Sequence, residues 1–162
     1  GLDGSALTQL TNRPSSNENY PDWSPDGKKI VFDSSISGNS GEAEIYVMDA
    51  DGSNSTRLTT NTTTDMNPAW SPDGTKIAFQ SLRDGNHEIY VMDANGDNQS
   101  NVTNNSASDS YPSWSPDGRK LVFTSSRDES TWWEIYAMDA DGESVIRLTN
   151  NMTFDGYPSW SP

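Results

Sequence analysis

One motif recurs along the sequence at a nearly constant interval, and this limits the possible folds more than any other feature. Trp-Ser-Pro-Asp-Gly begins at Trp23, Trp70 and Trp114, and Trp-Ser-Pro returns at Trp160. The four tryptophans are 47, 44 and 46 residues apart. Self-similarity with a period of roughly 20 to 50 residues indicates a propeller or a solenoid, in which one supersecondary unit is repeated.

Two further markers keep step with the tryptophan. The segment Glu-Ile-Tyr-Val-Met-Asp occupies residues 44–49 and 88–93, and residues 134–139 differ from it only by Ala for Val. A Leu-Thr or Val-Thr pair begins at Leu10, Leu58, Val102 and Leu148. Because the three markers stay in phase, each repeat is one structural unit rather than a chance recurrence.

Each repeat predicts four short antiparallel strands. The first ends at the tryptophan, and Ser-Pro-Asp-Gly then forms a turn, since Pro presets φ and Gly accepts a positive φ. The second strand alternates in polarity, as in residues 76–80. The third, as in residues 88–92, ends in Asp-Gly or Asn-Gly turn chemistry, and the fourth lies around the Leu-Thr pair. Four strands in about 45 residues correspond to one propeller blade.

We therefore expect an all-β fold, a β-propeller of four-stranded antiparallel blades, with three complete blades and a partial strand at each end. The chain is predicted to be a single propeller segment over residues 1–162, with blades at about 18–60, 65–104 and 109–150. The extra strands are expected at residues 5–12 and 156–162. The repeat tryptophans, Trp23, Trp70, Trp114 and Trp160, are expected to pack between blades.

The order of these motifs resembles the TolB-type β-propeller repeat family over essentially the whole chain. The resemblance implies a periplasmic or extracellular location and a binding module that holds a protein or peptide partner on one face and in its channel. Related repeats also imply an alternative, the propeller part of an enzyme, either a polysaccharide lyase or the gating domain of a serine peptidase.

Three blades do not close a ring, because propellers contain about four to eight blades. Two chains could close a six-bladed ring as a homodimer, or the chain could be a piece of a longer propeller. The spare end strands disfavour a simple closure by two chains. We nevertheless expect self-association, since an isolated half ring buries too little surface.

The charge balance excludes several classes of partner. The chain has 24 acidic and 10 basic residues and a net charge of −14, so we expect no binding to nucleic acid. No apolar run approaches the roughly 20 residues of a membrane helix, so we expect no membrane insertion. With no cysteine and a single histidine, His87, common zinc sites and Ser-His-Asp triads are disfavoured within one chain.

An acidic residue stands five positions before each repeat tryptophan, namely Glu18, Asp65, Asp109 and Asp155. Because the first strand of a blade lines the central channel, we expect these carboxylates to gather at one channel mouth. Oxygen ligands in such a ring suit Ca²⁺. The alternative is that each carboxylate caps its own loop. The aspartates of the repeated turn, Asp26, Asp73 and Asp117, are explained by turn geometry, and no catalytic residue is predicted.

Two groups of residues are candidates for binding a partner. Tyr20, Asn67, Tyr111 and Tyr157 stand three positions before the tryptophans and are expected to form a polar and aromatic rim beside the acidic ring. Trp132 and Trp133 lie in a loop of the third repeat and have no aromatic equivalent in the other repeats. Paired aromatic side chains suit an interface anchor or a sugar platform. The alternative is that one ring folds onto a blade.

Overall fold

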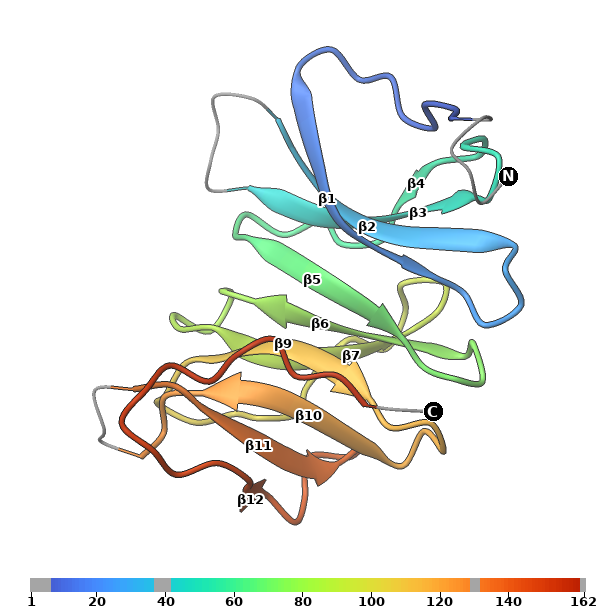
Figure 1. Ribbon diagram of the computed structural model, residues 1–162. Coiled ribbons are helices and arrows are strands. Elements are labelled where there is room, and N and C mark those ends of the chain that lie inside the picture. The colour runs from blue at the N-terminus through green and yellow to red at the C-terminus, as the bar shows by residue number, and fades with distance from the viewer. Residues whose placement is uncertain (1–6, 37–41, 129–131, 161–162) are drawn as a thin grey trace.

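The alternating segments of each repeat form a separate sheet. In residues 7–36, 42–128 and 132–160, which the computed structural model describes, twelve strands make three four-stranded sheets (Figure 1). Within each sheet the strands follow chain order and neighbouring strands pair antiparallel. The predicted all-β fold with three propeller blades is thereby confirmed.

The strand bounds follow the repeat closely. The first blade contains β1 (Ser16–Trp23), β2 (Lys29–Ile36), β3 (Ala43–Asp49) and β4 (Thr56–Arg57). The second contains β5 (Asp65–Trp70), β6 (Lys76–Ser81), β7 (Glu88–Asp93) and β8 (Ser100–Asn101). The third contains β9 (Asp109–Trp114), β10 (Lys120–Ser125), β11 (Glu134–Asp139) and β12 (Ile146–Arg147).

The Ser-Pro-Asp-Gly motif joins the first two strands of every blade. In the second blade, Ser71 Oγ donates to Asp73 Oδ1 at 2.7 Å, and the same oxygen accepts from the Thr75 N–H at 3.0 Å. The Gly74 N–H closes the turn on the Ser71 carbonyl oxygen, and Gly74 has a φ of +70°. The aspartate is therefore a turn residue, as its regular spacing indicated.

Neighbouring blades are joined by apolar seams. The third strand is apolar on both sides because its two faces meet different neighbours. Tyr90 and Met92 of β7 pack toward the first blade, while Ile89 and Val91 pack toward the third. Each seam also contains the tryptophan of the later blade, Trp70 in one seam and Trp114 in the other. The core is thus a set of thin layers, which explains why a chain with only 31% hydrophobic residues can fold.

The Leu-Thr pairs follow the short fourth strands and contact the next blade. A Cβ added to Gly96 would lie 2.9 Å from the Leu58 carbonyl oxygen, and one added to Gly142 would lie 2.3 Å from that of Val102. Leu10 stands in the same relation to Gly52, at 2.4 Å. Residues 7–12 therefore take the place of a preceding blade's outer edge.

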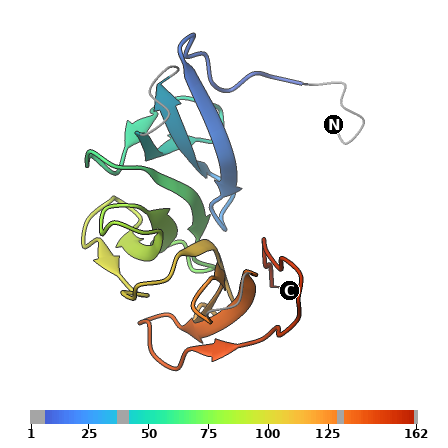
Figure 2. The ribbon, with the colours of Figure 1, turned by 90° about the vertical axis from the view of Figure 1, so that its left-hand side faces the viewer.

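Neither flanking segment forms a strand in the described part of the chain. Residues 7–12 and 156–160 have no regular secondary structure, and residues 5–6 and 161–162 of the expected strands lie outside the described residues. Figure 2 shows the three sheets following one another along an arc, with the segment after β12 returning on the inner side. The first strands β1, β5 and β9 contact one another in succession, so they form the channel side of the blades.

The described ranges contain no helix with the length and apolar character needed to cross a membrane.

Candidate functional site

The inner strands share an irregularity at the same place in every repeat. In β1 the pairing register with β2 shifts between Asn19 and Asp22, and β5 shifts between Met66 and Ala69. The residue at the irregularity has a left-handed backbone each time and is followed by proline. The φ values are 48° at Tyr20, 53° at Asn67, 57° at Tyr111 and 56° at Tyr157.

A left-handed backbone is costly for a tyrosine. It costs roughly 1–2 kcal/mol for a residue other than glycine, and tyrosine lacks the short polar side chain that lets asparagine adopt it. The same strained conformation recurs in four successive repeats, so it is a regular feature of the channel wall. Backbone strain of this kind clusters at binding sites and active sites. The candidate site is therefore the row of Tyr-Pro and Asn-Pro pairs.

These pairs surround one hollow on the channel side. Its volume is about 230 Å³, and its lining consists of Tyr20, Pro21, Asn67, Pro68, Tyr111, Pro112, Tyr157 and Pro158. Tyr20 and Tyr157 are exposed, at 50% and 64%, whereas Asn67 is buried. The structure thus brings together all four residues that the sequence assigned to a partner-binding rim.

The tyrosines of the third blade and of the segment after it are in direct contact. The rings of Tyr111 and Tyr157 have centroids 4.3 Å apart and are inclined by 47°. Hydrogen bonding with Tyr157, and secondly burial, raise the pKa of the Tyr111 hydroxyl to about 12. The Tyr111 hydroxyl therefore stays protonated at neutral pH and presents a donor and an acceptor beside flat apolar rings.

Asn67 replaces a tyrosine in this row and is fixed by a polar network. Its backbone N–H donates to Asp33 Oδ1 of the first blade at 3.1 Å, and its Nδ2 donates to Gln80 Oε1 at 2.9 Å. Gln80 Nε2 in turn lies 2.8 Å from Nδ1 of His87, which is half-buried. The asparagine leaves room in the hollow between the tyrosines on either side.

Two carboxylates of the first blade bind backbone N–H groups of the second. Asp33 is 2% exposed, and burial raises its pKa to about 6. Asp22 accepts from the Trp70 N–H at 2.7 Å, and burial raises its pKa as well. No repeated motif pointed to this pair, because the equivalent residues of the second blade are Ala69 and Gln80.

Two of the acidic residues expected at the channel mouth, Asp65 and Asp109, form hydrogen bonds and ion pairs within their own blades. Arg83 donates to Asp65 Oδ2, and Arg127 to Asp109 Oδ2, each at 2.9 Å. An asparagine four residues earlier, Asn61 or Asn105, donates to the same oxygen. Each buried aspartate is thus paired with a cation of its own blade.

The other two acidic residues lack an arginine partner among the described contacts. Ser16 and Ser34 donate to Glu18, and Asn151 donates to Asp155 Oδ2. Across the described residues, no three acidic or histidine side chains converge in a way that could hold a metal ion. Asp65 Oδ1 and Asp109 Oδ1 are buried without a hydrogen-bond partner. Calcium binding stays a prediction from the sequence.

The tryptophan pair lies on the loop between β10 and β11. Trp132 is 43% exposed, and Trp133 is half-buried. The Trp133 carbonyl oxygen accepts from the Asp155 N–H at 2.9 Å, two residues before Tyr157. The pair therefore borders the acidic edge of the channel, and its exposed member is Trp132.

The sequence analysis missed the residues whose hydrogen bonds link the third and fourth strands at this edge. In the first blade Glu44 is buried, and both Arg57 and Thr59 donate to its carboxylate. Glu134 of the third blade accepts in the same way from Arg147 and Thr149. A signal for this contact was present in the sequence. Each third-strand marker begins with Glu and each Leu-Thr or Val-Thr pair ends with Thr, and a buried polar side chain at a repeated position needs a hydrogen-bond partner.

Comparison with known proteins gives the family context of this site. Residues 40–162 match the sequence family described as the Tricorn protease N-terminal β-propeller domain. A search of curated protein sequences found no match.

Several solved structures share the fold. A putative TolB from Agrobacterium tumefaciens has 31% identity and a TM-score of 0.74, over 86% of this chain and 51% of that one. TolB from Acinetobacter baumannii has 27% identity and a TM-score of 0.73, over 86% and 34%. An oligogalacturonate lyase in complex with manganese has 17% identity and a TM-score of 0.70, over 91% and 46%, which shows the fold alone. The chain thus spans from about a third to half of these proteins.

Proposed function

Because the chain belongs to the Tricorn protease N-terminal β-propeller family and carries TolB-like blades, we propose that it is a non-catalytic binding module for a protein or peptide partner. The observation that carries the proposal is the row of strained Tyr-Pro and Asn-Pro pairs around the channel hollow. Rigid aromatic rings with hydroxyl groups give a large contact area at little conformational cost. Their exposure to solvent leaves them available to a partner.

The size of the hollow favours a narrow ligand. A volume of about 230 Å³ is below the range of roughly 300–1,000 Å³ typical of small-molecule sites. One loop or an extended peptide that places a single side chain between the rings fits this space better than a folded surface does. The paired prolines keep the wall rigid because proline fixes φ.

Selection of peptides against the intact chain tests this function. We expect displayed random peptides that bind the wild-type chain to lose binding to Tyr111→Asn. This variant removes a ring but keeps the backbone conformation, since Asn67 adopts the same φ in the second blade. Asp51→Asn, at an exposed turn outside the channel lining, is the control. Selected peptides that bind both variants as well as wild type contradict a channel site.

The proposal includes self-association through the two outer blade faces. Trp23 is 54% exposed, whereas Trp70 is 7% and Trp114 is 8% exposed in their seams. A hollow of about 350 Å³ lies beside Trp23, between Leu10, Pro21, Phe32 and Met48. At the other end, Ile146 and Leu148 of the third blade are 55% and 52% exposed. Two faces of this kind suit head-to-tail contact between copies, with displacement of the flanking segments.

The resemblance and the carboxylates also support two finer proposals. TolB-like repeats favour a periplasmic or extracellular location. A calcium ion near Asp155 and the unpartnered oxygens of Asp65 and Asp109 stays a proposal, which melting curves with added calcium and with a chelator test. Identical melting temperatures in the two conditions contradict it.

The alternative function is the propeller part of an enzyme. The family name points to a peptidase propeller, and one similar structure is an oligogalacturonate lyase, so this fold also occurs in a lyase. A panel of oligogalacturonates and peptides, incubated with the chain alone and with added manganese, separates the two functions. Turnover of any member by the chain supports the enzyme, and loss of that turnover in a channel variant would locate it.

A further inference from the structure

The edge of the blades opposite the acidic residues carries one cleft at each seam. The first-seam cleft, between blades one and two, has a volume of about 640 Å³. The second-seam cleft, between blades two and three, has a volume of about 690 Å³. Both open beside the Ser-Pro-Asp-Gly turns, whereas Asp65 and Asp109 stand at the opposite ends of β5 and β9.

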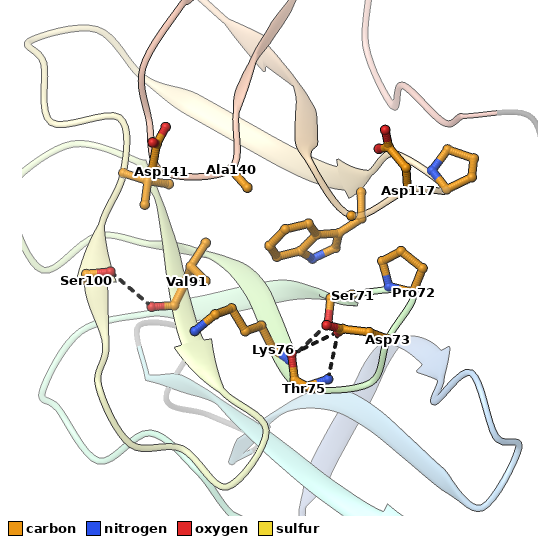
Figure 3. A pocket seen from close by; sticks show the side chains of 14 residues that line it. Ser71, Pro72, Asp73, Thr75, Lys76, Val91, Ser100, Asp117, Ala140 and Asp141 are labelled. Atoms are coloured by element: carbon orange, nitrogen blue, oxygen red, sulfur yellow. Dashed lines mark hydrogen bonds between the residues drawn. The ribbon is translucent and has the colours of Figure 1, made fainter.

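The repeat builds the two clefts from equivalent residues. Apolar side chains make the floor of the second-seam cleft, namely Trp114, Val91, Val102, Pro72, Pro116 and Ala140. Trp70, Val47 and Leu58 take the corresponding places in the first-seam cleft. Figure 3 shows the second-seam cleft, with Val91 and Lys76 on one side, Ala140 and Asp141 on the other, and Asp117 above Pro72 at one end.

The two clefts differ in charge. Asp73, Asp117 and Asp141 line the second-seam cleft together with Lys76. Lys76 is already paired, because its Nζ lies 3.0 Å from Asp93 Oδ1.

In the turn aspartates Oδ1 is occupied, since it accepts from Ser71 in Asp73 and from Ser115 in Asp117. Their Oδ2 atoms have no hydrogen bond within the described residues. Hydrogen bonding from Ser115 and, to a smaller extent, the charge of nearby Arg119 lower the pKa of Asp117. Within the described residues, however, none of the three carboxylates of the second-seam cleft forms a salt bridge, and they lie beside the indole of Trp114.

The first-seam cleft is neutralised at two positions. Lys28 stands where the second-seam cleft has Thr75, and its Nζ lies 3.3 Å from Asp26 Oδ2. Asn95 stands where the second-seam cleft has Asp141. Lys28 and Asn95 thus remove the negative charge that the equivalent positions leave in the second-seam cleft.

We propose that the second-seam cleft binds a basic side chain, arginine or lysine, of a partner polypeptide. The apolar lining takes the aliphatic stem, and the ring face of the Trp114 indole attracts the cation. The three carboxylates balance the charge, and arginine can bond more than one of them because its guanidinium carries five donors. The net charge of −14 steers such a partner toward the surface. This site is separate from the channel and does not depend on the proposed function.

Tryptophan indole resonances in an NMR titration test the proposal site by site. The probe is Nα-acetyl-arginine methylamide, and the neutral control is the citrulline analogue of the same shape. We expect the arginine compound to shift the indole N–H of Trp114 and to leave that of Trp70 in place. The citrulline analogue is expected to move neither resonance. Equal shifts by both compounds would mean an apolar or sugar-like site and would overturn the proposal.

The internal repeat supplies matched variants that are compatible with the fold. Thr75→Lys copies Lys28 and is tolerated by the turn, since the third blade has Arg119 at that position. It is expected to weaken binding at Trp114 at least five-fold. The double variant Lys28→Thr/Asn95→Asp gives the first-seam cleft the charges of the second and is expected to create a response at Trp70. An unchanged affinity in Thr75→Lys, or no response at Trp70 in the double variant, contradicts the proposal.

Two charge-matched variants separate local binding from general attraction to an acidic protein. A single surface carboxylate contributes about 0.2–1 kcal/mol, so Asp141→Asn is expected to weaken binding by a factor between about 1.4 and 5. Asp51→Asn, on the first blade outside both clefts, is the charge-matched control and is expected to change affinity less than Asp141→Asn. An equal loss in both variants would show that only the net charge matters.

Discussion

The indole N–H of Trp114 donates a hydrogen bond to the carbonyl oxygen of Ala69 across the seam between the second and third blades, at 3.1 Å. Trp114 also belongs to the same apolar cluster as Ala78 and Val91 of the second blade, so one residue joins two blades by both apolar and polar interactions. We expect Trp114→Ala to lower the free energy of unfolding by about 3–5 kcal/mol, as for other buried tryptophans. Urea denaturation measures this loss.

Trp23→Ala is the matched control for that measurement, because Trp23 has the same place in the repeat but is exposed. Its effect is expected to stay within about 1 kcal/mol. Equal losses in the two variants would show that the seams do not hold the blades together.

Burial of Asp33 makes the first seam sensitive to pH. Its pKa is about 6 in the folded chain, against an ordinary value of 3.8, so folding favours the protonated form. Its contribution is full below about pH 4 and is lost as pH rises through about 6. Relative to Asp33→Asn, the wild-type chain is therefore expected to lose about 1–2 kcal/mol of unfolding free energy between pH 4 and pH 7.

Urea titrations at several pH values give this difference. Asp26→Asn is the control, since hydrogen bonding from Ser24 lowers the pKa of the exposed Asp26 carboxyl. Its difference from wild type is expected to stay flat in the same window. A flat difference for Asp33→Asn as well would mean that the carboxylate is solvated.

Close approach of neighbouring blades makes one glycine irreplaceable. A Cβ at Gly142 would lie 2.3 Å from the Val102 carbonyl oxygen, whereas one at Gly27 would have nothing within 4 Å. Both residues have a positive φ, so alanine costs about 1–2 kcal/mol at either position through the backbone alone. Gly142→Ala is expected to cost at least a further 1–2 kcal/mol because the blades must separate. Thermal or urea denaturation measures the loss of stability in Gly142→Ala and Gly27→Ala. Equal losses in the two variants would contradict the close contact.

The exposed blade faces predict a concentration-dependent mass. Light scattering of the wild-type chain is expected to give more than the 17.8 kDa of one chain. Trp23→Ala removes a large apolar side chain from one face and is expected to shift the mass toward that of one chain. A wild-type mass of 17.8 kDa at every concentration, with or without a chelator, contradicts self-association.

The period of the sequence was sufficient to predict the blades, their strands and the turn role of Asp73, because local turn chemistry and alternation determine them. It could not predict which tryptophan is buried. Trp23, Trp70 and Trp114 have the same local sequence, but each is buried only where a preceding blade packs against it. Trp70 and Trp114 have such a blade, and Trp23 of the first blade does not.

The site was predicted in part. The four residues of the channel rim were identified by position alone. Their left-handed backbone was not predicted, because a following proline ordinarily favours an extended backbone at the residue before it. The arginines that pair with Asp65 and Asp109 come from the loops after β6 and β10, outside the repeat markers. The charge difference between the two clefts depends on Lys28 and Thr75, which a search for shared motifs passes over because they differ.

Partner binding in the channel hollow is measured by the affinity of one selected peptide. Isothermal titration with the wild-type chain is compared with Tyr111→Asn, Tyr157→Asn and the control Asp51→Asn, at an exposed turn outside the channel lining. We predict that each channel variant weakens binding at least ten-fold, as expected when an aromatic anchor worth about 1.4 kcal/mol or more is lost. The control is predicted to leave the dissociation constant within a factor of about two. Unchanged binding in both tyrosine variants would contradict the account.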